Sequence, residues 1–275
     1  MQRTEMKRGP QRFFPAVVVL TGLGYASYFL SKLIFVLLGV PLYLLMTPWP
    51  RAQERMLQVV THHFLGFFTR VWLPLFQVYE VVEISGREKT EQLRPVILVS
   101  NHRGFMDSIF LLGLSARTGA LTKASHARQP MYHLLVRHFD LVSVDRESLA
   151  SVATASARCR RLLAAGKNLL IFPEGTRARS RRLQPFNRLA FDLALAAQVP
   201  VLPVVIHSTE PFMSKLPGSV FPRRRNYYRI RFLDPELPSA GDTATALSDR
   251  VHRRIAQELK SLDAGTSWEN NQPMT

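Results

Sequence analysis

Apolar and polar positions follow two different patterns along the chain. Residues 13–46 form an apolar run that carries a single charge, Lys32. One helix of about 34 residues would reach roughly 50 Å, which exceeds a hydrocarbon core of about 30 Å. Two full spans would need about 40 residues plus a turn, which is slightly more than the run provides. The pattern favours a helical hairpin that breaks near Ser31 and Lys32 and dips into one leaflet, with a single tilted span as the alternative.

Basic residues flank this apolar run on both sides. Such flanks place both ends of the run on the cytoplasmic side of a membrane. The run is too long for a secretory signal peptide, and no small-residue cleavage site follows it. We therefore expect residues 1–50 to anchor the protein to an inner (cytoplasmic) membrane, with the rest of the chain on the cytoplasmic side. The flanking residues are Arg3, Lys7, Arg8 and Arg12 before the run, and Arg51 and Arg55 after it.

A second kind of pattern follows the anchor. Residues 51–77 place polar and apolar side chains at helical spacing, which predicts an amphipathic helix that packs on a core or lies at a lipid interface. From residue 78 to 262, short β-type runs alternate with helical ones, and a loose polar tail is expected at 263–275. This alternation predicts an α/β domain with a largely parallel sheet flanked by helices. The expected strands are VYEVVEI, VILVS, LVSV, NLLIF, VPVLPVVI and YYRIRFL, and the expected helices are 107–116, 131–138, 148–165, 187–198 and one carrying Leu247, Val251, Ile255 and Leu259.

Net charge and cysteine content narrow the classes of function. The formal net charge is +16, from 36 Lys+Arg against 20 Asp+Glu, and a charge of this size indicates an anionic partner. Nucleic-acid binding would not explain the apolar hairpin, so we expect anionic membrane lipids and no nucleic acid. The single cysteine, Cys159, excludes an internal disulfide framework and a Cys-rich zinc site. Its helical surroundings indicate a small buried residue rather than a nucleophile.

The stretch VSNHRGFMDS at residues 99–108 follows a predicted strand and carries His102 and Asp107. Five helical positions turn through about 500°, which would leave these two side chains some 140° apart. They can meet only if His102 lies on the turn before a helix and Asp107 lies in its first turns. Asp107 would then accept from one ring nitrogen and leave the other available as a general base.

The stretch IFPEGTRARSRR at residues 171–182 also follows a predicted strand. Ligand sites on open α/β sheets gather at the carboxyl ends of strands. One arginine in such a place would be an ordinary solvated residue, whereas a group of four suits a phosphate or a phospholipid head group. Arg146, in VDRES after another strand, could add a phosphate contact. The four are Arg177, Arg179, Arg181 and Arg182.

Taken together, these segments resemble the PlsC-type glycerolipid acyltransferases, typified by 1-acylglycerol-3-phosphate acyltransferase. The first motif of that family, NH followed by four residues and D, is matched by Asn101, His102 and Asp107. The second ends in an arginine after an apolar strand, as Arg146 does. The third, FPEGTR, is matched without a gap by residues 172–177, and the fourth is a Pro-centred apolar strand like VPVLPVVI. The order and separations also agree, and the resemblance covers about residues 78–235.

Two positions depart from the family pattern. The first motif often carries Ser two positions after the histidine, where this chain has Gly104. The segment after FPEGTR usually ends in PFK-x-G, whereas this chain reads PFNRL, with Leu189 in place of the glycine. The second departure leaves the acceptor pocket, and with it the identity of the lysolipid, open.

The resemblance implies a membrane-bound acyltransferase that acts on a lysophospholipid. His102 would take the proton from a free hydroxyl, which then attacks an acyl thioester, while Asp107 holds the imidazole tautomer. The first acceptor to expect is 1-acylglycerol-3-phosphate, with phosphatidic acid as product. The alternatives are another lysolipid acceptor, of the lysophosphatidylcholine type or a lyso-aminolipid, and a non-catalytic lipid-binding protein. Residues expected on the head-group side are Arg146, Glu174, Gly175, Thr176, Arg177 and, after the strand ALTKAS, Lys123.

No cofactor and no metal are expected. Acyl-CoA or acyl carrier protein would serve as co-substrate, and both are anionic. The chain shows no nucleotide-binding glycine loop and no G-x-S-x-G elbow for a covalent acyl-enzyme.

Overall fold

The computed structural model describes residues 14–49, 52–53, 56, 67, 71–72, 75–76, 79–114, 117–127, 140–180, 182–210, 212–220 and 226–264. The helix expected at 131–138, most of the amphipathic helix expected at 51–77 and the tail beyond Ala264 lie outside these residues.

Seven strands within the described residues form one sheet, in the order β1-β7-β6-β2-β5-β3-β4. Every neighbouring pair is parallel except β6 and β7, so the predicted largely parallel α/β sheet is confirmed. The central strands are buried on both faces, as parallel strands covered by helices require. The strands are β1 (Tyr79–Ser85), β2 (Ile97–Ser100), β3 (Thr118–Lys123), β4 (Leu141–Val144), β5 (Asn168–Ile171), β6 (Val201–Ser208) and β7 (Asn226–Phe232).

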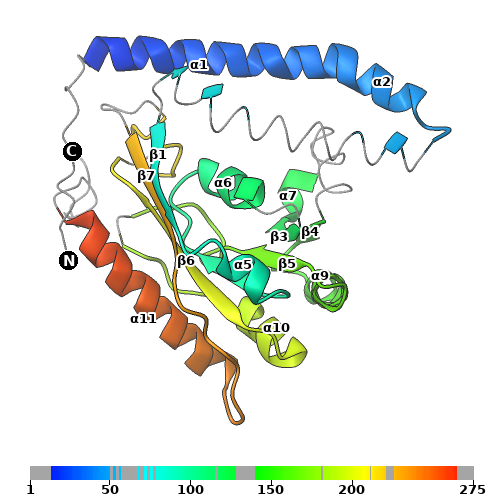
Figure 1. Ribbon diagram of the computed structural model, residues 1–275, viewed down its shortest axis with the longest axis vertical. Helices are drawn as coiled ribbons and strands as arrows, with labels where there is room; N and C mark the ends of the chain where they lie inside the picture. Colours follow the sequence, from blue (N-terminus) through cyan, green and yellow to red (C-terminus); the bar gives the residue numbers. More distant parts are fainter. Residues whose placement is uncertain are drawn as a thin grey trace.

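Helices cover both faces of this sheet (Figure 1). Alternate residues of β2 point to opposite faces, so Ile97 and Val99 join one apolar cluster while Leu98 joins the other. The first cluster includes residues of α9, α10 and α11, and the second includes residues of α6. The helices of the α/β domain are α5 (Lys89–Gln92), α6 (Met106–Leu114), α7 (Ala124–Ala127), α9 (Leu149–Ala164), α10 (Leu189–Ala197) and α11 (Ala244–Asp263).

The last helix, α11, packs along β6 through the predicted stripe. Leu247, Val251, Ile255 and Leu259 are all buried, because they recur at the spacing that places them on one face. The helix begins at a Thr243 cap, whose side chain accepts from the Ala246 N–H. It continues through Asp263, so the first residue expected in the loose tail instead ends a helix.

The N-terminal apolar run is helical from α1 (Phe14–Ile34) through a π-helical segment, η1 (Phe35–Gly39), to α2 (Val40–Leu45). The break predicted near Ser31 and Lys32 is wrong, because the helix continues through both residues. Within this helix the Ser31 hydroxyl donates to the Tyr28 carbonyl at 2.8 Å.

The helical run ends instead at a turn over residues 46–48. Beyond that turn the chain doubles back: the Gln53 side-chain amide donates to the Tyr43 carbonyl at 2.8 Å, and the Trp72 ring lies 6.4 Å from that of Tyr28. The chain therefore reverses direction about fifteen residues later than the sequence suggested, and residues 14–45 do not form the predicted hairpin.

The helix formed by α1, η1 and α2 runs across one end of the α/β domain and extends beyond it (Figure 1). It touches the domain through Tyr25, whose hydroxyl donates to the Val220 carbonyl at 2.7 Å. Within the part of the chain that the structure describes, no helix combines the length and apolar character needed to cross a membrane. Many large apolar side chains of α1, η1 and α2 are exposed: Val19, Leu23, Phe29, Leu30, Leu33, Ile34, Leu37, Leu38, Leu42, Leu44 and Leu45.

Candidate active site

The sheet order brings the predicted site segments to one edge. Strands β2, β5, β3 and β4 are parallel neighbours, so their carboxyl ends lie side by side. His102 follows β2, Glu174 follows β5, Lys123 ends β3 and Arg146 follows β4. Segments that are far apart in the sequence therefore meet where α/β sheets bind their ligands.

His102 and Asp107 form the contact that their spacing predicts. His102 lies on the loop after β2 and Asp107 is the second residue of α6, so the two side chains can face each other. The His102 Nδ1 atom is 2.9 Å from the Asp107 Oδ2 atom. A carboxylate in this position selects the tautomer with the proton on Nδ1, which leaves Nε2 able to accept a proton.

Asp107 is fully buried, and its charge is held by a second donor as well. The Gly104 N–H donates to the same Oδ2 atom at 2.8 Å. The hydroxyl of Tyr228 is also buried near this carboxylate, and burial together with the Asp107 charge raises the pKa of Tyr228 well above its usual value. Tyr228 therefore stays protonated beside Asp107 and cannot add a second negative charge to the site.

The loop that carries His102 is fixed on several sides. The Phe172 ring stacks on the imidazole with ring centres 4.1 Å apart, and the Ala178 N–H donates to the His102 carbonyl at 2.7 Å. The Asn101 side chain exchanges two hydrogen bonds of 2.8 Å with the backbone of Ile206 on β6. Such support limits rotation of a catalytic side chain before substrate binds.

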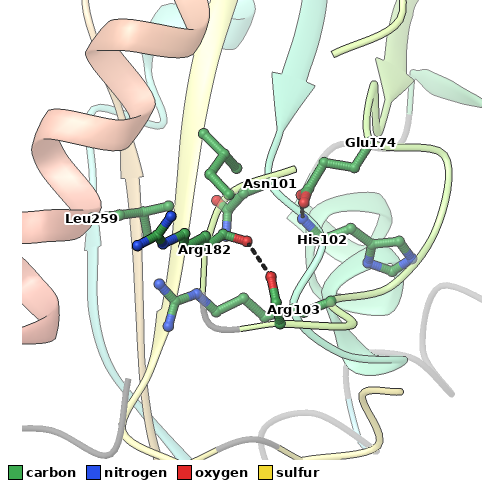
Figure 2. Close-up of a pocket in the computed structure, with 9 residues that line it drawn as sticks. Asn101, His102, Arg103, Glu174, Arg182 and Leu259 are labelled. Carbon is green, nitrogen blue, oxygen red and sulfur yellow. Dashed lines mark hydrogen bonds between the residues drawn. The ribbon is translucent and has the colours of Figure 1, made fainter. Parts of the chain in front are cut away.

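Glu174 contacts the backbone of its own chain, although the sequence placed it on the head-group side. One carboxylate oxygen accepts from the His102 N–H at 2.7 Å, and the other accepts from the Gln184 N–H at 3.0 Å. Figure 2 shows Glu174 directed at the His102 backbone, with the imidazole pointing away from it. Burial raises the pKa of Glu174 to about 7, although both hydrogen bonds act in the opposite direction. Glu174 thus ties two loops of the site together.

A pocket lies beside this loop, between it and α11 (Figure 2). It is lined by Asn101, His102, Arg103, Glu174, Ala178, Ser180, Arg182, Leu183 and Leu259. The His102 ring points away from the Arg182 and Leu259 side of this pocket, so the pocket lies on the supporting side of the loop.

Gly175 and Arg146, both expected on the head-group side, are in close contact with each other. Gly175 has a φ of +67°, and a Cβ atom there would lie 1.6 Å from the Arg146 Nη1 atom. The positive φ favours glycine, and the Arg146 guanidinium occupies the space that a side chain would take. The neighbouring Thr176 hydroxyl is buried and has no hydrogen-bond partner among the described residues.

Arg177 is held by a residue that the sequence did not single out. Its Nη1 atom donates to the Met213 carbonyl at 2.7 Å, and the Phe105 N–H donates to the same oxygen at 3.2 Å. Met213 has a φ of +49°, an uncommon conformation for a side chain of its size. The segment after β6 therefore joins the first and third motifs. No pattern around Met213 marks it, because the contact uses only its main-chain oxygen.

Five basic side chains gather at this edge of the sheet: Lys123, His126, Arg177, Arg179 and Lys215. We call them the cation cluster. Burial first, then the charges of Arg177 and Lys123, lower the pKa of His126. Burial first, then Arg179, Lys123 and Arg177, lower the pKa of Lys215. Mutual repulsion of this kind is relieved by a bound anion. No sequence pattern marked His126 or Lys215, although Lys215 lies nine residues past the end of the predicted strand VPVLPVVI.

Cys159 and the potential metal ligands among the described residues show no arrangement for catalysis. Cys159 is buried in α9, and burial raises the pKa of its thiol to about 11, so it is not a nucleophile at neutral pH. No group of three or more His, Cys, Asp or Glu side chains in the described part of the chain could hold a metal ion.

Comparison with known proteins agrees with this arrangement. Residues 81–207 match a family model described as Acyltransferase. The fold is similar to the crystal structure of the 1-acyl-sn-glycerophosphate (LPA) acyltransferase PlsC from Thermotoga maritima, with a TM-score of 0.68 and 18% identity over 93% of this chain and 100% of that one. The α/β sheet, the His-Asp pair after β2 and the FPEGTR segment after β5 are thus similar to those of the PlsC-type acyltransferases, and the family match covers residues 81–207, a little under half of the chain.

Named relatives agree in their descriptions. The chain is 26% identical to the chloroplastic 1-acyl-sn-glycerol-3-phosphate acyltransferase LPAT1 of Arabidopsis thaliana, over 86% of this chain and 62% of that protein. It is 30% identical to 1-acyl-sn-glycerol-3-phosphate acyltransferase alpha of Bos taurus, over 66% of this chain and 63% of that protein. The chain thus spans about three-fifths of the length of the curated relatives that it matches.

Proposed function

We propose that the protein transfers a fatty acyl group from an acyl thioester to the free hydroxyl of a lysophospholipid. The observation that carries this proposal is the 2.9 Å contact between His102 Nδ1 and Asp107 Oδ2, at the strand edge where the cation cluster also lies. The first acceptor is 1-acylglycerol-3-phosphate, whose esterification gives phosphatidic acid. The names of the relatives support this acceptor.

The chemistry follows from the free imidazole nitrogen. His102 Nε2 takes the proton from the acceptor hydroxyl as its oxygen attacks the thioester carbonyl carbon. The carbon–sulfur bond then breaks, and the thiolate recovers the proton from the imidazolium, which gives an ester and a free thiol. Asp107 stabilises the imidazolium and keeps its orientation. General-base assistance of this kind contributes about 10² to 10⁴ in rate.

The cation cluster supplies the charge that the acceptor phosphate needs. Arg177 and Lys123 belong to it, and Arg146 lies beside them against Gly175. Charge-assisted hydrogen bonds to phosphate are about twice as strong as neutral ones, so a few of these side chains suffice to orient the head group. The acyl donor is acyl-CoA or acyl carrier protein, and no cofactor is required.

The exposed apolar side chains of α1, η1 and α2 support association with the lipid that holds the acceptor. A helix lying in the interface buries such side chains without crossing the bilayer. The net charge of +16 adds attraction to anionic lipids, about 1 kcal/mol for each well-placed Lys or Arg. We place the protein on the cytoplasmic face of the inner membrane, in keeping with its basic flanks.

Other lysolipid acceptors are also tested below, because this chain reads PFNRL where the family usually has PFK-x-G. In the structure, Leu189 begins α10 and packs against the apolar core, while the Asn187 N–H donates to the Pro173 carbonyl. This segment therefore supports the loop after β5 through packing and backbone contacts.

Purified protein in detergent, supplied with labelled lysolipids of several head groups and with both donor types, tests the proposal. We expect phosphatidic acid to form from 1-acylglycerol-3-phosphate, and no product with His102→Ala. Transfer only to a choline or amino lysolipid would replace the acceptor. Absence of any acyl product, with lipid binding retained, would instead favour the non-catalytic lipid-binding alternative.

A further inference from the structure

Arg103 directly follows His102, and the two side chains leave the loop in opposite directions (Figure 2). The Arg103 side chain is buried, with 6% of its surface exposed. Its Nη2 atom lies 2.6 Å from the Oδ2 atom of Asp263, the last residue of α11. A single ion pair therefore connects the backbone of the catalytic loop to the end of a helix 160 residues further along the chain.

Both Arg103 and Asp263 occupy positions where a charged side chain of their kind is normally unfavourable. A buried guanidinium loses its hydration, and removal of its partner would leave an uncompensated buried charge. A carboxylate at a helix C-terminus faces the negative end of the helix dipole. Burial also raises the pKa of Asp263, and the charge of Arg103 opposes that shift. Positions where local rules are broken in this way are often functional.

His207 on β6 lies next to this ion pair, but it does not supply the positive charge that Arg103 provides. His207 Nε2 lies 3.5 Å from the Asp263 Oδ1 atom, and the imidazole is 1% exposed. Burial, followed by the charge of Arg103 and of two arginines on β7, lowers the pKa of His207 to about 3. His207 is thus neutral at ordinary pH, and Arg103 is the cation that faces Asp263.

The other restraints on the loop come from different directions. Glu174 and Ala178 hold the His102 backbone from the side of β5, and Asn101 holds it from β6. The Arg103 contact adds a restraint from α11, whose buried stripe fixes that helix to the sheet. The position of His102 along the loop is thereby coupled to α11.

We propose that Arg103 and Asp263 are positioning residues for acyl transfer, because their ion pair fixes the backbone on which His102 meets Asp107. This inference rests on the proposed function. A displacement of about 1 Å at a catalytic group can cost on the order of 10²-fold in rate. The Arg103 side chain leaves the loop on the side opposite to the His102 ring. Loss of the pair should consequently lower kcat and leave the KM values of both substrates nearly unchanged.

The test compares Arg103→Gln, Asp263→Asn and the double variant with a control ion pair near the other end of α11. Arg250 and Asp242 form an ion pair of 2.7 Å at the other end of α11, about 20 Å away along the helix. We expect either single change at Arg103 or Asp263 to lower kcat tenfold to a hundredfold, with both KM values within about twofold. Arg250→Gln and Asp242→Asn should lower the unfolding temperature and leave kcat unchanged.

The double variant separates a charge pair from two independent side chains. Neutralising both members removes the uncompensated charge, so its loss of kcat should be smaller than the product of the single losses. Should Arg103→Gln fail to fold, Arg103→Lys takes its place and should retain part of kcat, since an ammonium replaces only part of the guanidinium contact.

Three results would overturn the inference: a kcat for Arg103→Gln equal to that of Arg250→Gln, a rise in KM without loss of kcat, or strictly multiplicative losses in the double variant. In each case the wild type still transfers acyl groups and His102→Ala does not. A wild type without any transfer activity, or an active His102→Ala, would instead remove the proposed function itself.

Discussion

A Cβ atom on Gly104 would lie 2.3 Å from the carbonyl oxygen of Phe212. Non-bonded atoms do not approach so closely, so the missing side chain is what allows the segment after β6 to lie against the His102 loop. The next residues use this proximity, because the Phe105 N–H donates to the Met213 carbonyl. The glycine that departs from the family pattern thus has a steric reason in this fold.

We expect Gly104→Ala to lower both the free energy of unfolding and the rate of acyl transfer. The added methyl group must push the two segments apart, which typically costs about 1 to 3 kcal/mol. It should also move the Gly104 N–H away from Asp107 and lower kcat about tenfold or more. Gly113→Ala in α6 is the control, because a Cβ there meets nothing within 4 Å. Thermal unfolding and initial rates check both variants, and equal behaviour of the two would contradict the close approach.

The His102–Asp107 contact makes a prediction about tautomers. Asp107→Asn keeps the shape of the side chain but can present an N–H to the imidazole, which favours a proton on the wrong ring nitrogen. We expect kcat to fall on the order of 10³-fold or more, nearly as far as in His102→Ala. Asp192→Asn, in the first turn of α10, should have normal kcat. If Asp107→Asn retained more than a tenth of the wild-type rate, Asp107 would not be the orienting group.

The pKa of Glu174 gives a pH dependence with a defined sign. Its value of about 7 lies above the value of about 4.3 expected for an unfolded chain. The folded state therefore binds a proton more tightly, and this contribution to stability is full below about pH 4.3 and lost as the pH rises through 7. This difference in pKa corresponds to roughly 4 kcal/mol.

Glu174→Gln should remove that contribution. We expect the decrease in unfolding free energy between pH 5 and pH 8 to be smaller in the variant than in the wild type, by up to the amount given above. Urea unfolding at the two pH values measures the difference. An identical pH dependence of wild type and variant would show that Glu174 is already ionised in the folded protein at pH 5.

The arginines should affect binding of the acceptor more than binding of the donor. If Arg177 and Arg146 hold the acceptor phosphate, replacing either with Ala should raise the acceptor KM about tenfold to a hundredfold. Arg177→Lys should recover only part of the loss, because the Met213 carbonyl and a phosphate both need the guanidinium fork. Arg188→Ala, an exposed residue paired with Asp192, is the control. A raised donor KM with an unchanged acceptor KM would assign the arginines to the donor.

The apolar helix predicts binding to vesicles. Leu38 and Leu45 are 69% and 72% exposed, so replacing both with Asp should leave folding intact and weaken flotation with anionic vesicles. Leu149 on α9 is 87% exposed and serves as the control, since Leu149→Asp adds one such charge away from α1 and α2. Equal flotation of both variants would show that this helix does not contact lipid.

Sequence patterns identified the sheet and the main site because both depend on local rules. Strands with continuous apolar runs and helices with one apolar stripe need few tertiary contacts to define them. His102 and Asp107 could be paired because a strand, a turn and a helix leave little freedom between them.

Other features depend on contacts between distant segments. The N-terminal turn was misplaced because a lone Lys32 looked like a break, whereas a helix of apolar residues tolerates one long side chain. Glu174 was assigned to the substrate because its motif is next to arginines, and only the fold shows its oxygens on the His102 and Gln184 backbone. Met213 and Asp263 carry no local signal, since each contacts residues more than thirty positions away.

The hydrogen bond between Tyr25 and Val220 affects the distance between the apolar helix and the cation cluster. Burial raises the pKa of Tyr25 to about 12, so its hydroxyl remains a donor at every pH at which the protein would be assayed. Ser219, next to Val220, accepts from the Met213 N–H at 2.7 Å, and the Met213 carbonyl holds Arg177. The distance between the apolar helix and the cation cluster is thus set by a short series of hydrogen bonds. An amphipathic ligand that contacts both must match that distance.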